Sequence, residues 1–190
     1  CQGYSEPGSG SDLASLRTKA VLDGDHYIVN GQKTWTTMAQ HANLMFCLVR
    51  TSDEGKRQEG ISFLLIDMEQ PGVTVQPIKT IDGSVEINNV FLEDVKVPVA
   101  NRVGEENKGW TYAKDLLGHE RTSIAAVGRS KAQLKRLKTI ASAEEQDGKP
   151  LIHDPTFKEK IADIEISLLA LESLVLRVLS DESAGKGPGP

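Results

Sequence analysis

Three short stretches contain residue types that could take part in chemistry, and the first is "SEPGSGSD" at residues 5–12. Gly8 and Gly10 carry no side chains, so successive backbone N–H groups there could cradle an anion such as a pyrophosphate. The three serines could add hydroxyl donors. A solvated surface turn has the same composition, and composition alone favours that interpretation. The stretch matches neither the dinucleotide-binding nor the nucleophile-elbow motif.

The second stretch is "GQKTWTT", Gly31–Thr37. In a strand, alternate residues share a face, which predicts that Lys33, Trp35 and Thr37 point the same way. A flat indole beside a hydroxyl suits stacking and hydrogen bonding to a planar heterocycle. A core tryptophan next to a surface threonine also fits, and the stretch by itself favours that interpretation.

The third stretch, "LLGHERTSIAAVG" at residues 116–128, has helical spacing of its apolar residues. Glu120 lies in line with the apolar stripe and has no cation three or four residues away. Burial would raise the pKa of this carboxyl and make it a competent proton acceptor near neutral pH. A structural ion pair with Arg121, or with a group from elsewhere, is equally compatible. The stripe consists of Ala113, Leu117, Ile124 and Val127.

The histidines and cysteines do not indicate a metal centre. The four histidines are scattered without the spacing of metal ligands, and two cysteines are too few for a disulfide scaffold or a four-ligand cluster. We therefore predict no metal site and expect a reducing compartment. These residues are His26, His41, His119, His153, Cys1 and Cys47.

The overall composition limits the partners. The chain has 190 residues, of which 38% are hydrophobic and 26% charged, and a formal net charge of −5. An acidic protein is not drawn to nucleic acid or to a membrane surface. No apolar run approaches the roughly 18 residues of a membrane span, and the first residues do not have the pattern of a signal peptide. Because the chain starts at Cys1 and ends in "SAGKGPGP", we expect an internal piece of a longer polypeptide.

The first half of the sequence has the pattern of β-strands. Alternating runs meet at Asp23-Gly24-Asp25, which is typical of a hairpin turn. The runs "NLMFCLVRT" and "ISFLLID" indicate buried strands, whereas "GVTVQPIKT" and "EINNVFLEDVKVP" alternate and are bounded by Gly or Pro. About six antiparallel strands with short turns predict a small barrel or sandwich.

The second half of the sequence has the pattern of helices. Residues 110–145 have apolar residues at helical spacing, with Gly118 and Gly128 as points where the helix could bend. Residues 156–183 form a second long helical pattern. We predict an α+β fragment: an antiparallel β-barrel domain at 1–99, then two long helices of an incomplete bundle at 100–190. The stripe of the second helix is Ile161, Ile164, Leu168, Leu171, Val175 and Val178.

Four segments, in this order and spacing, resemble the acyl-CoA dehydrogenase family: "CQGYSEPGSGSD", "GDHYIVNGQKTWTT", "FLEDVKVP" and "GWTYAKDLLGHERT". The likeness extends from Cys1 to at least Arg136. It implies a flavoenzyme with an N-terminal helical domain, a middle β-barrel and a C-terminal helical bundle. Such an enzyme uses FAD to dehydrogenate the α,β bond of an acyl-CoA thioester: a carboxylate removes the α-proton and flavin N5 takes the β-hydrogen as hydride.

The resemblance also implies roles for individual residues. Glu120 matches the catalytic base of one branch of the family, whereas other members carry the base far downstream. Ser5 would bond the flavin ring edge, Gly10 and Ser11 would lie at the phosphates, and Ser11 would also touch the CoA arm. The expected FAD-binding residues are Gln2, Gly3, Tyr4, Ser5, Gly10, Ser11, Trp35, Thr36 and Thr37. The expected substrate-binding residues are Ser11, Gly118, His119, Glu120 and Arg121.

Two departures from the family pattern concern single positions. The family usually has alanine where Ser9 stands, a small-for-small change that we expect to be tolerated. Some members have aspartate at the position of Gly118, which puts that contact to the CoA arm in question.

The resemblance further implies partners and alternatives. We expect an acyl-CoA substrate, an electron-transferring flavoprotein as electron acceptor, and a homo-oligomer, dimer or tetramer, in the cytoplasm (bacterial type) or the mitochondrial matrix. The piece alone is expected to be inactive. An acyl-CoA oxidase or flavin monooxygenase of the same fold, and a non-catalytic flavin- or acyl-CoA-binding relative, are the alternatives.

Overall fold

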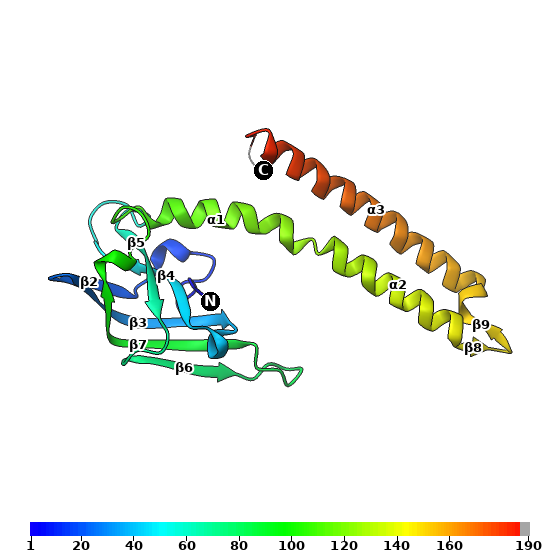
Figure 1. Ribbon diagram of the computed structural model, residues 1–190, viewed down its shortest axis with the longest axis horizontal. Helices are drawn as coiled ribbons and strands as arrows, with labels where there is room; N and C mark the ends of the chain where they lie inside the picture. Colours follow the sequence, from blue (N-terminus) through cyan, green and yellow to red (C-terminus); the bar gives the residue numbers. More distant parts are fainter. Residues whose placement is uncertain (187–190) are drawn as a thin grey trace. The chain divides into compact units, whose positions relative to one another are not determined.

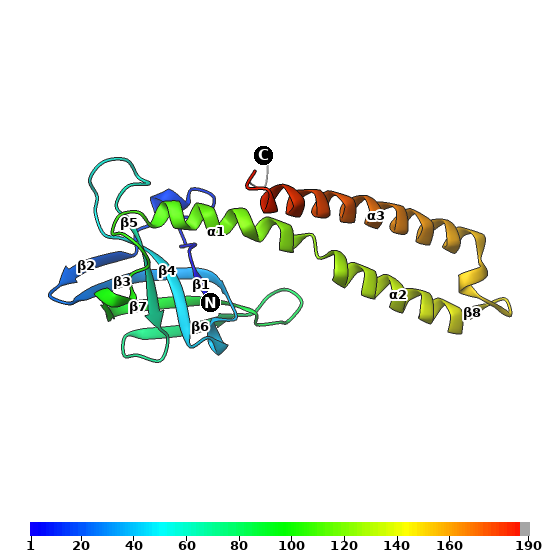
Figure 2. The same cartoon turned by 45° about the horizontal axis from the view of Figure 1, so that its top comes forward.

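The computed structural model describes residues 1–186, without the side chains of residues 119–123. Contacts between residues divide the chain into two units, Cys1–Asp115 and Leu116–Pro190, and each is considered separately. Figures 1 and 2 show the strands of the first unit and the helices of the second.

The first unit contains one seven-stranded sheet, in which β3, β7 and β6 lie side by side (Figure 1). Short helical turns at Leu13–Ser15, Ala39–His41 and Val99–Asn101 connect some of the strands. The strands are β1 (Gln2–Gly3), β2 (Lys19–Asp23), β3 (His26–Thr37), β4 (Leu44–Arg50), β5 (Ile61–Asp67), β6 (Val73–Ile78) and β7 (Ile87–Pro98).

The pairing of these strands confirms the α+β class and corrects the predicted sheet. The order is β1-β4-β2-β3-β7-β6, with β5 paired to β4, and this open path does not confirm a barrel. The sheet is mixed rather than antiparallel, because β1 and β2 both run parallel to β4. The first of these parallel contacts joins two residue pairs and the second only Lys19 and Arg50. Contacts this short leave no periodic pattern from which direction can be predicted.

The predicted hairpin and buried strands are confirmed. Asp23 pairs with His26, so Gly24 and Asp25 form a two-residue turn, and Gly24 has the positive φ of 63° that such turns require. β4 and β5 pair along their whole lengths and are largely buried. The core of the unit includes Tyr27, Val29, Met45, Cys47, Val49, Leu64, Ile66, Val90, Leu92, Val95 and Val97.

Strand β3 contains a bulge that the alternating pattern does not predict. Between the pairs Lys33–Val90 and Thr36–Asn88, β3 advances three residues while β7 advances two. One extra residue reverses the alternation of side chains beyond it. Lys33 is therefore buried whereas Trp35 is exposed, and the prediction that the two share a face is wrong.

The start of helix α1 (Gly109–Ile124) is fixed on the sheet within the first unit. A side chain at Gly109 would place its Cβ 2.6 Å from the backbone carbon of Ser62, so only glycine allows this close approach. Asn107 donates its backbone N–H to the Ser62 hydroxyl at 2.8 Å, and its side chain accepts a hydrogen bond from Thr51 at 2.7 Å. These contacts hold the first turn of α1 against β5.

The prediction of two long helices is wrong, because the described residues form three. Residues 110–145 form two helices, α1 and α2 (Val127–Ala143), which are separated at Ala126 and not at Gly118 or Gly128. Ala126 has the left-handed φ of 46°, which interrupts the hydrogen-bond ladder of a right-handed helix. The third helix is α3 (Pro155–Ser183).

In the second unit, a short hairpin connects α2 to α3, and the two helices lie side by side in both views (Figures 1 and 2). The hairpin pairs β8 (Glu145–Gln146) with β9 (Lys149–Pro150), and a helical turn follows at Leu151–His153. Helix α3 begins where the Asp154 carboxylate accepts the N–H of Phe157 at 2.8 Å, as an N-cap should.

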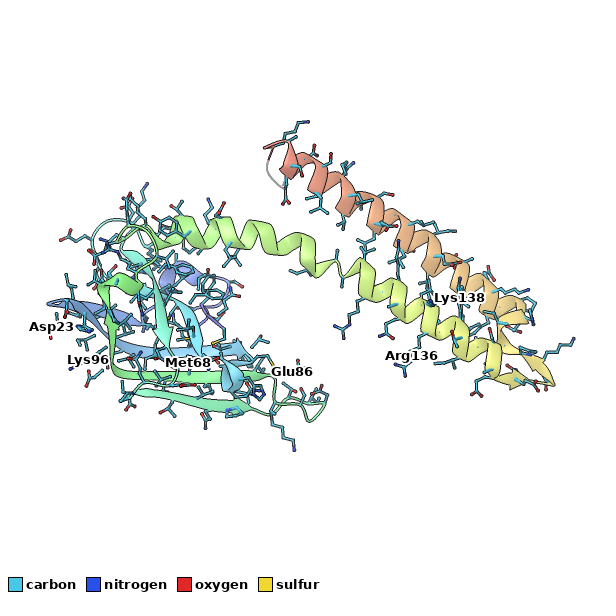
Figure 3. The ribbon with its side chains drawn as sticks, in the orientation of Figure 1. Asp23, Met68, Glu86, Lys96, Arg136 and Lys138 are labelled. Carbon is cyan, nitrogen blue, oxygen red and sulfur yellow. The ribbon has the colours of Figure 1, made fainter. Side chains whose placement is uncertain are left out.

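Ion pairs and a few buried residues connect α2 with α3. Lys131 pairs with Glu172, and Lys138, labelled in Figure 3, pairs with Glu165. The apolar stripe predicted for α3 is confirmed in part: Ile161 and Leu168 are buried. Other large apolar side chains of α3 are exposed, namely Ile164, Ile166, Leu169, Leu171, Leu174, Leu176 and Leu179.

Candidate functional site

The opening loop of the chain contains a tight turn from Glu6 to Ser9. The backbones of these two residues exchange hydrogen bonds of 3.0 Å in both directions, with Pro7 and Gly8 at the tip. The Ser9 hydroxyl lies 3.0 Å from that of Ser15 and is buried, so it is used inside the loop. Of the three serines, Ser5 is half-buried and Ser11 is exposed.

A buried ion pair attaches this loop to the sheet. Lys33 is 0% exposed and Glu6 is 7% exposed, and the ammonium lies 2.8 Å from Glu6 Oε1. The carboxylate also accepts the backbone N–H of Arg17 at 2.6 Å and that of Thr18 at 2.9 Å.

These contacts determine the charge of Glu6. Burial raises the pKa of its carboxyl, but the Lys33 charge and the hydrogen bonds that the carboxylate accepts lower this pKa by more. The net pKa lies below the ordinary value, and the carboxylate is therefore ionised at neutral pH.

Neighbouring residues of β3 hold the backbone just before Glu6. Lys33 donates a second hydrogen bond to the Tyr4 carbonyl at 3.2 Å, and Thr34 donates its N–H to the Ser5 carbonyl at 2.9 Å. Three successive residues, 4 to 6, are thus bound to two successive residues of β3.

Glycines of the loop differ in what surrounds them. A Cβ on Gly3 would lie 2.5 Å from Met45 Sδ, so the packing of the sheet excludes a side chain there. A Cβ on Gly8 or Gly10 would meet no atom within 4 Å, and neither glycine has a positive φ. Neither the internal packing nor the backbone conformation requires glycine at these two positions, which leaves the backbone of Gly10 open to an outside group.

The bulge in β3 presents Trp35 at the surface. This tryptophan is 60% exposed, and its φ of 58° lies in the left-handed region, which bulky residues rarely occupy. Strained backbone of this kind costs of order 1–3 kcal/mol and is concentrated at functional sites. Thr37 is exposed on the same side, whereas Thr36 is only 1% exposed and its hydroxyl has no hydrogen-bond partner among the described residues.

Gln2, Gly3 and Tyr4 precede the loop and belong largely to the sheet. Gln2 and Gly3 form β1 beside β4. The Tyr4 ring is buried edge-on against Phe46, with ring centroids 5.8 Å apart. These three residues position the loop, and the Tyr4 side chain faces the interior.

The residues predicted to act on the substrate lie mainly in the second unit. Gly118 lies within α1 and is half-buried. The side chains of His119, Glu120 and Arg121 lie outside the described part of the structure, so the prediction for the base is not tested. Ser11 belongs to the first unit.

Sequence analysis missed the roles of Glu6 and Lys33. Strict alternation with Trp35 predicts that Lys33 is on the same side as the indole. Alternation from Tyr27 and Val29, which are buried in the same strand, instead places Lys33 inside. A lysine that faces the interior needs a buried carboxylate as its partner, and Glu6 in the opening stretch could have been predicted as that partner.

The described residues contain neither a metal-binding cluster nor a helix suited to a membrane. Within residues 1–186, side chains of 119–123 excepted, no group of three or more His, Cys, Asp and Glu could hold a metal ion. Over the same part of the chain, none of the helices combines the length and hydropathy needed to cross a membrane. Cys47 is free and buried, and burial raises the pKa of its thiol to about 11.

A β unit with an exposed, strained indole and a glycine-containing loop, followed by a helical unit, defines an α+β protein. The family model described as "Acyl-CoA dehydrogenase, middle domain" matches residues 1–95, and "Acyl-CoA dehydrogenase, C-terminal domain" matches residues 107–190. The chain belongs to the acyl-CoA dehydrogenase family, whose members are FAD-dependent oxidoreductases acting on CH–CH bonds. This confirms the resemblance.

Individual relatives and solved structures support this family membership. Acyl-CoA dehydrogenase FadE26 of Mycobacterium tuberculosis is 38% identical over 192 residues, covering 99% of this chain and 48% of its own length. A crystal structure of acyl-CoA dehydrogenase from Geobacillus kaustophilus matches with a TM-score of 0.87 at 33% identity, covering 97% of this chain and 50% of that one. The ChsE4-ChsE5 complex from Mycobacterium tuberculosis matches with a TM-score of 0.83 at 37% identity, covering 96% and 47%. The chain spans about half the length of these relatives.

Proposed function

We propose that the full-length protein dehydrogenates the α,β bond of an acyl-CoA thioester with FAD as cofactor. The observation that carries this proposal is the exposed Trp35 on a strained bulge, bound through the preceding residues of β3 to the loop that contains Ser5 and Gly10. Family membership supplies the class of reaction.

The residues of the first unit fit the cofactor. The open backbone at Gly10 and the exposed Ser11 suit a pyrophosphate, because N–H groups without side chains in front of them can approach an anion closely. The exposed indole of Trp35 and the hydroxyl of Thr37 suit a planar ring system. Ser5, whose carbonyl accepts the N–H of Thr34, suits the ring edge. Thr36 would contribute its backbone, because its side chain faces inward.

The reaction needs one group that accepts a hydride and another that accepts a proton. FAD, when bound, supplies an acceptor for the hydride that leaves the β-carbon. In our proposal Glu120 takes the α-proton as general base. Gly118, His119 and Arg121 flank it and would line the thioester, while Ser11 would bind the CoA arm. The domain boundaries proposed for this chain, 1–99 and 100–190, divide these roles between the β domain and the helical domain.

Partners of the full-length protein follow from the same proposal. Electrons would leave to an electron-transferring flavoprotein. We propose an oligomer, either of identical subunits, a dimer or tetramer, or of two different chains as in the ChsE4-ChsE5 complex. A location in the cytoplasm or the mitochondrial matrix remains part of the proposal.

The experiment is an anaerobic single-turnover measurement on the full-length protein, with and without Glu120→Gln. Acyl-CoA should bleach the flavin of the wild type. The Gln variant keeps shape and polarity but cannot accept the proton, so its reduction rate should fall by about 10²–10⁴-fold while FAD and acyl-CoA still bind.

Other outcomes would point elsewhere. A near-normal reduction rate with a lowered melting temperature would make Glu120 a structural ion pair and place the base in another segment. Rapid reoxidation of the bleached flavin by oxygen would favour an oxidase or monooxygenase. Binding of FAD and acyl-CoA without any bleaching would favour a non-catalytic relative.

A further inference from the structure

We propose that Lys33 and Glu6 are positioning residues: their buried ion pair holds the Ser5–Ser11 loop in register with the Trp35 bulge, and thereby sets the affinity for FAD. This inference deepens the proposed function and rests on it. It assigns a role to two residues that do not themselves face the cofactor surface.

Hydrogen bonds from β3 attach residues 4 to 6 of the loop to the sheet. Strand β1 ends at Gly3, so the ladder that it forms with β4 does not reach Ser5. Beyond Gly3, Lys33 donates to the Tyr4 carbonyl and to Glu6, and Thr34 donates to the Ser5 carbonyl. Two of these three bonds come from one ammonium group.

The position of Lys33 in the strand connects the two halves of the site. It lies two residues before Trp35 and at the last regular pair before the bulge, opposite Val90. The same short segment therefore fixes the backbone around Ser5 and presents the indole. A change in the position of the Lys33 ammonium would move the loop relative to Trp35.

The Glu6 carboxylate completes the attachment on the other side. It accepts the backbone N–H groups of Arg17 and Thr18, which lead into β2. Glu6 is thus bound both to β3 and to the two residues that precede β2. Charges this deeply buried must be paired, because an unpaired buried charge costs free energy. An arrangement of the loop that separates Glu6 from Lys33 is therefore unfavourable.

The test compares FAD affinity in full-length variants whose apoproteins are folded. The double variant Glu6→Gln/Lys33→Met removes both charges together, because replacing a buried pair by neutral groups of similar shape is often neutral for stability. Glu6→Gln alone is the second variant, since it keeps an oxygen that can accept backbone N–H groups. Lys96→Met is the matched control: Lys96, labelled in Figure 3, is exposed on β7.

Three quantities are measured: the melting temperature of each apoprotein, the Kd for FAD by flavin fluorescence well below that temperature, and the visible absorption band of the bound flavin. We expect the Kd of the double variant to rise by about tenfold or more, as the loss of hydrogen bonds to a charged group implies. The flavin band should shift, and Lys96→Met should match the wild type. A purely structural pair would leave both the Kd and the band unchanged, whatever the change in melting temperature.

An unchanged Kd and band in the folded double variant, or failure of both variants to fold, would overturn the inference and leave the pair a structural one. A wild-type protein that binds no FAD would instead overturn the proposed function. The two failures are therefore distinguishable.

Discussion

Gly10 and Gly3 show how one residue type can serve two purposes within eight residues of each other. At Gly3 a side chain would collide with Met45, so glycine is needed for packing. A Cβ on Gly10 would meet no atom within 4 Å, and φ is not positive. A substitution at Gly10 therefore separates binding from folding better than one at Gly3.

Gly10→Val in the full-length protein should bind FAD about tenfold or more weakly, because a branched side chain blocks close approach of the pyrophosphate to the backbone. The melting temperature of the apoprotein should stay close to wild type, since the new side chain meets no neighbour. Fluorescence titration with FAD gives the first quantity and a thermal melt the second.

Gly8→Val is the matched control for this prediction. Gly8 lies in the same loop, and its Cβ would be equally unobstructed, but it is not among the residues proposed to meet FAD. Equal FAD affinity in Gly10→Val and the wild type would remove Gly10 from the site.

Glu6 should make the stability of the protein sensitive to acid. Its pKa in the folded protein is below the ordinary value of 4.5, so the ionised form stabilises the fold. This contribution is complete above about pH 4.5 and is lost as pH falls through the lowered pKa. Urea denaturation between about pH 6 and pH 3 should show wild type losing more stability than Glu6→Gln, and parallel curves for the two proteins would contradict the assignment.

From sequence, the candidate site could be proposed only through the family resemblance. Composition alone favoured a solvated turn around Gly10 and a core tryptophan at position 35, whereas the structure exposes Trp35 and leaves the Cβ position of Gly10 unobstructed. The Lys33–Glu6 pair was not predictable, because it joins residues 27 positions apart and because the bulge after Lys33 turns Trp35 to the opposite face. Alternation fails at a bulge for geometric reasons that composition does not reveal.

Among the elements, the junction between β5 and α1 depends on Gly109. Gly109→Ala should destabilise the protein by about 1–3 kcal/mol, because the new methyl group must displace the backbone at Ser62. Gly128→Ala is the matched control in α2, where a Cβ meets nothing within 4 Å; alanine there should be neutral or stabilise by about 0.5–1 kcal/mol. Urea denaturation measures both, and equal stability of the two variants would show that α1 is not held as described.

The elements themselves were largely predictable because their periods are strong. The four runs from β4 to β7 and the helical segments follow from alternation and helical spacing. The direction of β1 and the break at Ala126 did not follow, for two reasons. A two-residue strand has no period, and an alanine in the left-handed conformation looks like any other helical alanine in sequence.

At the scale of the whole molecule, α3 presents much more apolar surface than it buries against α2. Ile166, Leu169 and Leu176 are exposed, and only Ile161 and Leu168 of this helix are buried. Exposed apolar patches of this kind mark surfaces that associate. The chain is about half as long as its relatives, so a partner for this surface is expected from the full-length protein.

The 190-residue chain expressed alone should therefore self-associate, bind the dye ANS, and show no bleaching of added FAD by acyl-CoA. Light scattering after gel filtration, ANS fluorescence and anaerobic absorbance measure the three properties. The full-length protein under the same conditions is the control. A monomeric chain without ANS binding would show that the exposed face of α3 needs no partner.

The left-handed φ of Trp35 also has a consequence for protein engineering. Glycine adopts that conformation without the penalty that a bulky residue pays, and an indole this exposed loses few contacts when it is removed. A selection for heat resistance alone would thus reward replacement of Trp35 by glycine and would discard the residue that we propose to present a flat surface to FAD. On this proposal, libraries built on this scaffold should hold position 35 constant, since thermal tolerance and cofactor retention would select opposite residues there.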